Sequence, residues 1–326
     1  MDMQDEIIKI LCDGKYHSGA ALGERLGVSR AAIWKRLKSI ELAGLEVEKK
    51  RGVGYKLADK LELLSVNSIK QYLTAETSAA IQHIVLLGTI DSTNTFVKRF
   101  SEECGATRII ALAERQTAGR GRHGKRWLGS FAGGINMSII WEFESGAASL
   151  EGISLAVGVA TRRALTQMGI GEVKLKWPND VFLSGKKLGG ILLEVLGDPS
   201  GPCSVIIGVG INYFISDAVR KNIDQPLTDI VSETPNHVSR NALCASLISE
   251  LIKLLKSYES SGFMPYRDEW QLSDITYGRE CTIQAGKEAI TGTAIGIDVN
   301  GAIILRTEIG KEFRFLGGNL SLRLAK

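Results

Sequence analysis

A glycine- and arginine-rich stretch between two apolar runs limits the possible folds more than any other feature of the chain. The nine residues from Gly119 to Trp127 (GRGRHGKRW) contain three glycines and four Lys or Arg side chains. The flanking runs 108–113 and 135–141 are typical of strands, so the stretch is predicted to connect two strands of a folded sheet. Glycine lets a backbone approach a ligand closely, and the planar guanidinium of arginine suits carboxylates and phosphates. We therefore expect an anion-binding loop; a solvated basic loop is the alternative.

The length and composition indicate an ordinary globular protein of two or three domains. The 326 residues are 44% hydrophobic and 23% charged, and no apolar run reaches the eighteen residues of a membrane span. The acidic N-terminus lacks the basic and apolar regions of a secretion signal, and the five cysteines are scattered without a CxxC pair. We therefore expect a cytoplasmic protein without a disulfide framework, a zinc site or a membrane partner. The net charge of +4 permits a polyanionic partner.

Residues 1–60 have the pattern of a winged helix-turn-helix. The expected elements are amphipathic helices at 4–12, 19–26 and 30–43 and a hairpin at 45–57. The helix-turn-helix would occupy residues 19–38, and the hairpin has a basic tip, as a wing does. Residues 1–58 carry eleven Lys and Arg against eight Asp and Glu, which is three of the four net positive charges.

The third helix of this segment has the expected DNA-contacting face. Its apolar residues Ile33, Leu37 and Ile40 form one stripe, so its basic side chains lie away from the core. Attraction to phosphates supplies most of the non-specific affinity of proteins for DNA. The predicted DNA-binding residues are on this helix and on the wing: Ser29, Arg30, Trp34, Lys35, Lys38 and Arg51. A three-helix cap without a role in DNA binding is the alternative.

The rest of the chain is predicted to form two further domains, which makes the protein an α+β multidomain chain. Residues 65–272 alternate strands with helices and are expected to form a mixed-sheet α/β domain, with a helix at 67–73 capped by Asn67 or Ser68. Residues 273–326 contain short strand-like runs separated by turns, a pattern that favours a small SH3-like β-barrel.

Two polar clusters in the middle segment could carry chemistry. Residues 91–94 (DSTN) precede a helix expected to begin around Thr95, and they could cap that helix or dock the polar head of a ligand. Lys176 and Asp180 flank a rigid Trp-Pro pair, and Lys187 begins an apolar strand, where a buried lysine is costly without a partner. Cations, an acid able to hold Mg²⁺ and an apolar slot suit nucleotide chemistry on a carboxylate. The chain lacks the GxxxxGK[ST] motif of P-loop ATPases.

Four motifs, in order, resemble those of the biotin protein ligases. They are DSTN at 91–94, GRGRHG at 119–124, KWPND at 176–180 and KLGGIL at 187–192. With the N-terminal winged helix, essentially the whole chain resembles the bifunctional class, which combines a ligase with a class II synthetase-like catalytic domain and a repressor of the biotin operon. Four motifs that match in order are far more specific than any one of them.

The resemblance implies a two-step reaction. Biotin and Mg-ATP would form biotinyl-5′-AMP and pyrophosphate, and biotin would then pass to a lysine of the biotin carboxyl carrier protein of acetyl-CoA carboxylase. The implied cofactors are ATP and Mg²⁺, with biotin as a substrate. The biotin carboxylate and the α-phosphate are both anionic, so cations are needed to offset their repulsion and the charge of the transition state.

The resemblance also implies a role for each matching residue. The catalytic residues would be Lys187, Arg120 and Arg122. The biotin-binding residues would be Ser92, Thr93, Asn94, Gln116, Arg120, Gly121, Arg122, Lys187, Gly208 and Gly210. The ATP-binding residues would be Arg122, Lys125, Trp127, Lys176 and Asn212. Asp180 would hold Mg²⁺, and His123, where close relatives often have arginine, is expected to have no acid–base role.

In the bifunctional class the adenylate is also the corepressor. Its binding would order the glycine-rich loop and promote a homodimer that binds the operator DNA of the biotin operon with two winged helices. One alternative is a lipoate or octanoyl protein ligase, which shares the general fold. Another is a non-catalytic, ligand-sensing transcription factor.

Overall fold

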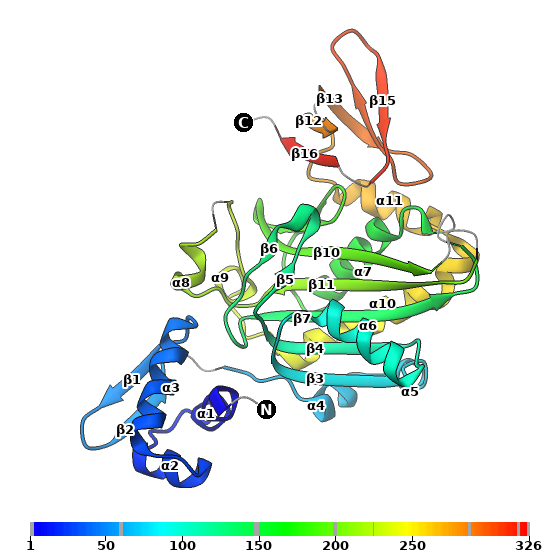
Figure 1. Cartoon of the computed structure of the whole chain (residues 1–326). Helices are drawn as coiled ribbons and strands as arrows, with labels where there is room; N and C mark the ends of the chain where they lie inside the picture. The colour runs from blue at the N-terminus through cyan, green and yellow to red at the C-terminus, as the bar shows by residue number, and fades with distance from the viewer. Residues whose placement is uncertain are drawn as a thin grey trace.

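The computed structural model describes residues 3–58, 61–146, 150–197, 201–223, 225–285, 288–317 and 320–324. Figure 1 shows three units that follow one another along the chain: a small helical unit, a central sheet with helices, and a small β unit above the sheet. The predicted fold class is confirmed in each of the three segments. In the described part of the chain, none of the helices has the length and apolar character that spanning a bilayer requires.

The N-terminal unit is a winged helix-turn-helix. Its elements are α1 (Met3–Leu11), α2 (Gly19–Leu26), α3 (Arg30–Leu42), β1 (Val47–Lys50) and β2 (Gly54–Leu57), the last two paired antiparallel. Serine caps begin the second and third helices: Ser18 accepts from the N–H of Ala21 and Ser29 from that of Ala32. Gly27 ends α2 with a φ of 67°, a conformation that favours glycine.

The hydrophobic core of this unit extends into the central domain. The stripe of Ile33, Leu37 and Ile40 packs with α1, as its spacing predicts, and Phe131 and Ala132 complete the same cluster from the middle of the chain. Buried Asp5 of α1 accepts hydrogen bonds from the N–H and the hydroxyl of Thr89, both at 2.9 Å. The N-terminal unit is therefore packed against the central domain and does not depend on the connecting segment alone.

The central domain is built on a seven-stranded mixed sheet in the order β3-β4-β7-β11-β10-β9-β8. Its strands are β3 (His83–Ile90), β4 (Ile109–Gln116), β7 (Gly134–Phe143), β8 (Val173–Lys176), β9 (Asp180–Leu183), β10 (Lys186–Gly197) and β11 (Cys203–Asn212). Only the β3–β4 pair is parallel. A tight turn at Ser184-Gly185 joins β9 to β10, and both of its residues have positive φ.

Helices cover both faces of the sheet. They are α4 (Val66–Tyr72), α5 (Ala75–Ala79), α6 (Thr93–Cys104), α7 (Ile153–Gln167), α8 (Asp217–Arg220), α9 (Ile230–Glu233), α10 (Arg240–Ser261) and α11 (Met264–Ser273). Alternate residues of β4 point to opposite sides: Ile109 packs in the cluster under α6, and Ile110 in the main core with α7 and α10. Arg240 is fully buried and pairs with Glu114 at 2.9 Å, so α10 is joined to β4 by charge as well as by apolar contact.

Two helix starts differ from the sequence prediction. Ser65, and not Asn67 or Ser68, caps α4, because its hydroxyl accepts from the N–H of Ser68 at 3.3 Å. The helix after the DSTN motif begins at Thr93 and not at Thr95, since Ser92 is its cap. Both errors are short shifts in which a neighbouring polar residue takes the capping position.

The C-terminal unit is a five-stranded antiparallel sheet consistent with the predicted SH3-like barrel. Its strands are β12 (Glu280–Ala285), β13 (Glu288–Ile297), β14 (Ile303–Arg306), β15 (Glu312–Phe315) and β16 (Leu320–Leu324), in the order β15-β14-β13-β12-β16. The indole N–H of Trp177 donates to the carbonyl of Gly301 at 3.1 Å, which ties the KWPND segment to this unit.

Candidate functional site

One cavity of about 610 Å³ collects residues from all four motifs, a size typical of small-molecule sites. Its walls are the glycine- and arginine-rich stretch, strands β10 and β11, the KWPND segment, and the β12 and β16 strands of the C-terminal unit. The predicted site residues that line it are Ser92, Thr93, Asn94, Gln116, Arg120, Gly121, Arg122, Lys125, Trp127, Lys176, Asp180, Lys187, Gly208 and Gly210.

The stretch from Gly119 to Trp127, called the flap below, is a small hairpin and not only a loop. Its ends pair as β5 (Gly119–Arg120) and β6 (Arg126–Trp127), and a 3-10 turn, η1 (Arg122–Gly124), forms its tip. His123 in the tip has a φ of 56°, and its ring Nε2 lies 3.2 Å from the carbonyl oxygen of Leu320 on β16. The flap therefore reaches across the cavity to the C-terminal unit.

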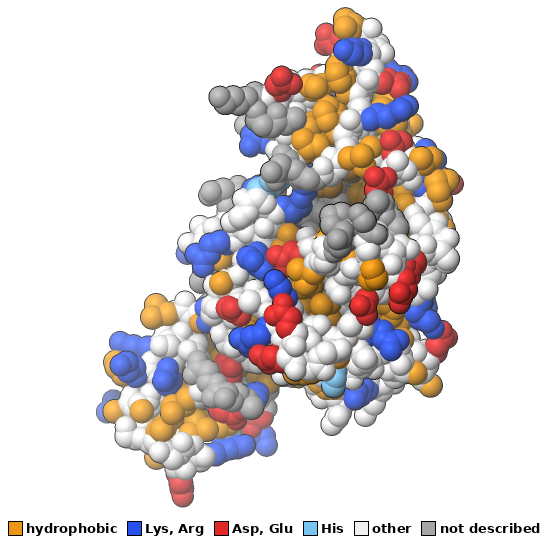
Figure 2. Space-filling model, turned by 45° about the vertical axis from the view of Figure 1, so that its right-hand side comes forward, with side chains coloured by type: hydrophobic (Ala, Val, Ile, Leu, Met, Phe, Trp, Pro, Cys, Tyr) orange, Lys and Arg blue, Asp and Glu red, His pale blue; other side chains and the backbone are white. Residues whose placement is uncertain are grey.

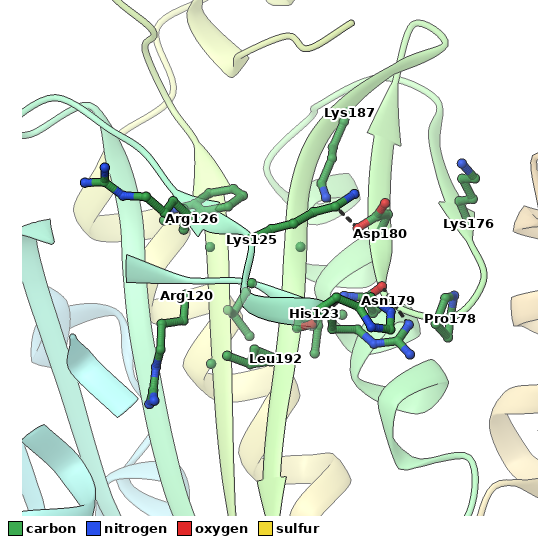
Figure 3. Close-up of a pocket in the computed structure, with 18 of the residues that line it drawn as sticks. Arg120, His123, Lys125, Arg126, Lys176, Pro178, Asn179, Asp180, Lys187 and Leu192 are labelled. Carbon is green, nitrogen blue, oxygen red and sulfur yellow. Dashed lines mark hydrogen bonds and ion pairs between the residues drawn. The ribbon is translucent and has the colours of Figure 1, made fainter. Parts of the chain in front are cut away.

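Cationic side chains gather around one acid at the end of the cavity next to KWPND. Lys187 Nζ lies 2.7 Å from Asp180 Oδ1, which gives the half-buried lysine the partner that its position requires. Figure 3 shows Lys125 and Lys187 close to Asp180, with Arg120 on the opposite side of the cavity. Burial, together with the nearby cations Lys187 and Lys125, lowers the pKa of Lys176, although Asp180 opposes the shift. This end has the charge expected of a polyphosphate site.

Arg122 lies between the flap and the two segments that face it. Its guanidinium donates to Asn179 Oδ1 and to the carbonyl of Leu320, both at 3.5 Å. Burial lowers the pKa of this guanidinium, and the charge of Asp180 partly compensates. An arginine keeps its charge through such a shift, so a partly desolvated cation faces the cavity.

Buried polar side chains form the other end of the cavity. The N–H and the hydroxyl of Thr93 donate to Gln116 Oε1 at 2.8 and 3.1 Å, and Ser138 donates to Asn94 Oδ1 at 2.5 Å. Ser92, Thr93 and Asn94 are all under 5% exposed. Ser92 therefore caps α6, which confirms one interpretation of the DSTN motif. The residues after it present polar atoms to the cavity, and docking of a ligand head there stays a prediction.

Gly208 and Gly210, which were predicted to bind biotin, lie where close contacts leave no room for a side chain. A Cβ on Gly208 would lie 2.5 Å from Asn94 Oδ1, and a Cβ on Gly210 would lie 2.6 Å from the indole ring of Trp127. The groups that approach β11 at these glycines are two side chains that also line the cavity, and binding of biotin against them stays a prediction.

One predicted residue does not line the cavity, and three residues that hydrogen-bond the predicted site residues were not predicted. Asn212 does not line the cavity, and its side chain donates to the carbonyl of Thr228 at 3.1 Å. The missed residues are Glu194, which pairs with Arg120 at 3.1 Å, Asn136, which accepts from Trp127 at 3.1 Å, and Asn179 beside Arg122. Asn179 was in a motif that the sequence singled out, but Glu194 and Asn136 carried no local signal.

The predicted DNA-contacting residues are all exposed on the N-terminal unit. Trp34 is 49% exposed, and Lys38 Nζ lies 4.1 Å from the centre of its ring. Ser29 acts as the cap of α3, and Arg51 lies in the turn between the wing strands. Figure 2 shows Lys and Arg side chains along the outer edge of this lobe, at lower left. The surface has the charge expected of a phosphate contact.

The architecture and the site define a class: an α/β ligase-type domain behind a winged helix. Models of three known domains match the chain in order. The HTH domain matches residues 4–56, the biotin/lipoate A/B protein ligase family matches residues 86–212, and the biotin protein ligase C-terminal domain matches residues 276–323.

Relatives in two bacteria are similar over almost their entire lengths. The bifunctional ligase/repressor BirA of Salmonella typhimurium is 35% identical, and that of Escherichia coli 34%, each over 98% of this chain and 97% of the relative. The biotin protein ligase of Aquifex aeolicus, solved in complex with biotin and ATP, is 27% identical with a TM-score of 0.63, covering 75% of this chain and all of that one. The chain belongs to the family of bifunctional biotin protein ligases and repressors.

Proposed function

We propose that this protein joins biotin to ATP, giving biotinyl-5′-AMP and pyrophosphate, and then transfers biotin to a lysine of a carrier protein. The observation that carries the proposal is the convergence of four separate motifs on one cavity, with cations at one end and buried hydrogen-bonding groups at the other. The cavity thus offers a site for a polyphosphate and a site for the polar head of biotin.

The cationic side chains of the cavity would stabilise the first step, in which biotin and ATP form biotinyl-5′-AMP. Arg122 and Lys187 would lie beside the biotin carboxylate and the α-phosphate and offset the charge of the pentacoordinate transition state. Lys125 and Lys176 would contact the leaving phosphates, and Trp127 would form a wall of the nucleotide site. Arg120 and Gly121 would close over biotin. Asn212 could reach the nucleotide only if the segment after β11 moves.

Asp180 fits a metal that arrives with the nucleotide. In the described residues no group of three or more His, Cys, Asp or Glu could hold a metal on its own. Mg²⁺ usually takes one or two carboxylates and otherwise binds phosphates and water, so one acid in the cavity is enough. When bound, Mg²⁺ would neutralise phosphate charge, and Lys187 would then be free to turn from Asp180 toward the reacting oxygens.

At the other end of the site, Ser92, Thr93, Asn94 and Gln116 would hydrogen-bond the ring head of biotin. In the second step, the amine of the carrier lysine would attack the acyl carbon, forming an amide and releasing AMP. We propose the biotin carboxyl carrier protein of acetyl-CoA carboxylase as the acceptor, because two further relatives are named biotin–[acetyl-CoA-carboxylase] ligases.

Pyrophosphate release tests the enzymatic proposal. Full-length protein mixed with biotin and Mg-ATP should release one equivalent of pyrophosphate rapidly and retain biotinyl-AMP, detectable by mass spectrometry. Release with lipoate or octanoate but not with biotin would favour the alternative ligase. Binding of biotin and ATP without release would favour a ligand-sensing transcription factor.

We also propose repression by an adenylate-linked dimer. The basic surface of α3 and the wing would contact operator DNA of the biotin operon, and residues 1–60, 65–272 and 273–326 would act as DNA-binding, catalytic and C-terminal domains. Sedimentation at micromolar protein with and without biotin plus ATP tests the dimer; a mass that does not change would contradict it.

A further inference from the structure

A chain of hydrogen bonds behind the cavity joins the two ends of the flap. It begins at Arg120 on β5, passes through the polar floor of the cavity and ends at Trp127 on β6. The residues along it are Arg120, Glu194, Asn94, Ser138, Thr93, Gln116, Asn136 and Trp127. The Ser138 and Thr93 hydroxyl oxygens lie 2.7 Å apart, and the backbone N–H of Thr93 continues the chain to Gln116. Glu194 and Asn136 are the members next to the flap, and neither side chain lines the cavity.

Glu194 sets the orientation of one amide in the cavity wall. One of its carboxylate oxygens accepts from Asn94 Nδ2 at 2.8 Å, and the other pairs with Arg120 at 3.1 Å. Because an ionised carboxylate can only accept, the nitrogen of Asn94 must face Glu194 and its oxygen must face Ser138 and Gly208. A flipped Asn94 would place two acceptors in contact.

Asn136 sets the orientation of the second amide, that of Gln116. It is 5% exposed, and its Nδ2 donates to the carbonyl of Ala113 at 3.2 Å, which leaves Oδ1 as an acceptor. That oxygen accepts from Gln116 Nε2 at 3.3 Å and from the indole of Trp127 at 3.1 Å. The oxygen of Gln116 is held by the N–H of Thr93, so both ends of this amide are determined.

We propose that Glu194 and Asn136 are positioning residues. They hold the two cavity amides in one orientation and tether the two ends of the flap to the same network. A ligand that hydrogen-bonds Asn94 or Gln116 therefore also acts on the position of the flap. This inference rests on the proposed function only for the identity of the ligand; the tether itself is a property of the chain without ligand.

The tether is tested without ligand by limited proteolysis. The flap contains Arg120, Arg122, Lys125 and Arg126 as tryptic sites. Loss of one tethering bond should raise their cleavage rate about fivefold, so Glu194→Ala and Asn136→Ala should both do so. The control is Glu269→Ala, which removes another ion-paired glutamate, bound to Arg162 and Arg163, and should leave flap cleavage unchanged. Wild-type rates in both test variants would overturn the proposal.

Two further variants separate tethering from folding. Glu194→Gln keeps an acceptor for Asn94 and should fall between wild type and Glu194→Ala. If Asn136→Ala does not fold, Trp127→Phe removes the same indole hydrogen bond from the flap side and should raise cleavage equally. Equal cleavage in Trp127→Phe and wild type would overturn the Asn136 tether.

A double-variant cycle on biotin binding tests whether the network acts as a unit. Glu194 and Asn136 lie at opposite ends of the chain of bonds, so independent residues should weaken biotin binding by the product of their single effects, within about twofold. We expect the double variant to weaken binding by clearly less than that product, and a simple product would contradict the inference. If the wild type binds no biotin, the proposed function fails and the proteolysis result still decides the tether.

Discussion

Lys187 and Asp180 have opposite charges and opposite predicted partners, yet in this structure they contact each other. The pair, at 2.7 Å, gives the half-buried lysine an acidic partner at the start of β10 and fixes the direction of its side chain. A metal-bound nucleotide would compete for Asp180 and an anionic substrate for Lys187. The pair is therefore best understood as a resting arrangement that substrate binding would replace.

Substitution of Lys187 should affect chemistry more than binding. Lys187→Ala removes a cation from the reacting carboxylate and phosphate, so we expect single-turnover pyrophosphate release to slow by roughly 10²–10³-fold, with biotin affinity lowered much less. The neighbouring lysine offers a matched control, because Lys186 is exposed and pairs weakly with Glu233 at 3.8 Å. Equal losses in Lys186→Ala and Lys187→Ala would contradict the assignment.

Asp274 should make stability depend on pH. Burial raises its pKa from the ordinary 3.8 to about 6, although hydrogen bonds from Thr276 oppose the shift. Between these two values the folded protein holds a proton that the unfolded chain releases, so stability falls as pH rises from about 4 to about 6 and remains lowered above that. The gap corresponds to about 3 kcal/mol at most.

Asp274→Asn should therefore stabilise the protein increasingly as pH rises. The amide keeps an oxygen for Thr276 but cannot ionise. Urea unfolding of both proteins at several values between pH 4.5 and 7.5 measures the difference. A difference in unfolding free energy that is independent of pH would show that Asp274 does not carry this titration.

At the scale of helices and strands, local signals predicted most of the fold. Serine caps, glycine ends and the apolar stripe of α3 act within a few residues, so they can be recognised without tertiary contacts. Most of the predicted cavity residues could be found because they lie in a short motif. Gln116, Lys125, Trp127, Gly208 and Gly210 line the cavity from outside the four motifs.

Contacts between distant strands left no such signal. Glu194 is the one acidic residue of β10, and its partners Asn94 and Arg120 are 100 and 74 residues away. Arg240 and Glu114 are 126 residues apart, and the sequence around each of them does not predict that they form a buried pair. Such pairs depend on strand order and register, which the spacing of residues along the chain does not specify.

The α3 helix should separate the two activities. A variant with both Arg30→Ala and Lys35→Ala removes two exposed cations from the predicted DNA-binding residues while leaving Ile33, Leu37 and the Ser29 cap in place. Operator affinity should fall and its salt dependence should weaken, because fewer phosphates are neutralised. Pyrophosphate release should be unchanged. DNA binding measured at several salt concentrations checks this, and loss of both activities would refute the separation.

At the scale of the whole molecule, the three units share contacts at the site. The flap touches the C-terminal unit through His123 and Leu320, and the segment after the flap enters the core of the N-terminal unit through Phe131. The DNA-binding unit and the flap are therefore connected by residues 128–131, a short path in the chain. Phe131 lies in the central domain's part of the chain but packs in the N-terminal core, so damage there should destabilise the N-terminal unit.

Phe131 tests this connection. It is 1% exposed and packs with Ile7, Ile33 and other residues of the N-terminal core. Phe131→Ala should cost about 3–5 kcal/mol, because a large side chain is removed from a packed core, and the loss should fall on the DNA-binding unit. In calorimetry we expect the N-terminal unit to unfold at a lower temperature than in the wild type, while the main transition, the unfolding of the central domain, stays nearly unchanged. Operator binding should weaken as well. Phe143→Ala, an equally buried phenylalanine of the main core, should instead lower the main transition. If Phe131→Ala lowers only the main transition, the shared core does not stabilise the DNA-binding unit.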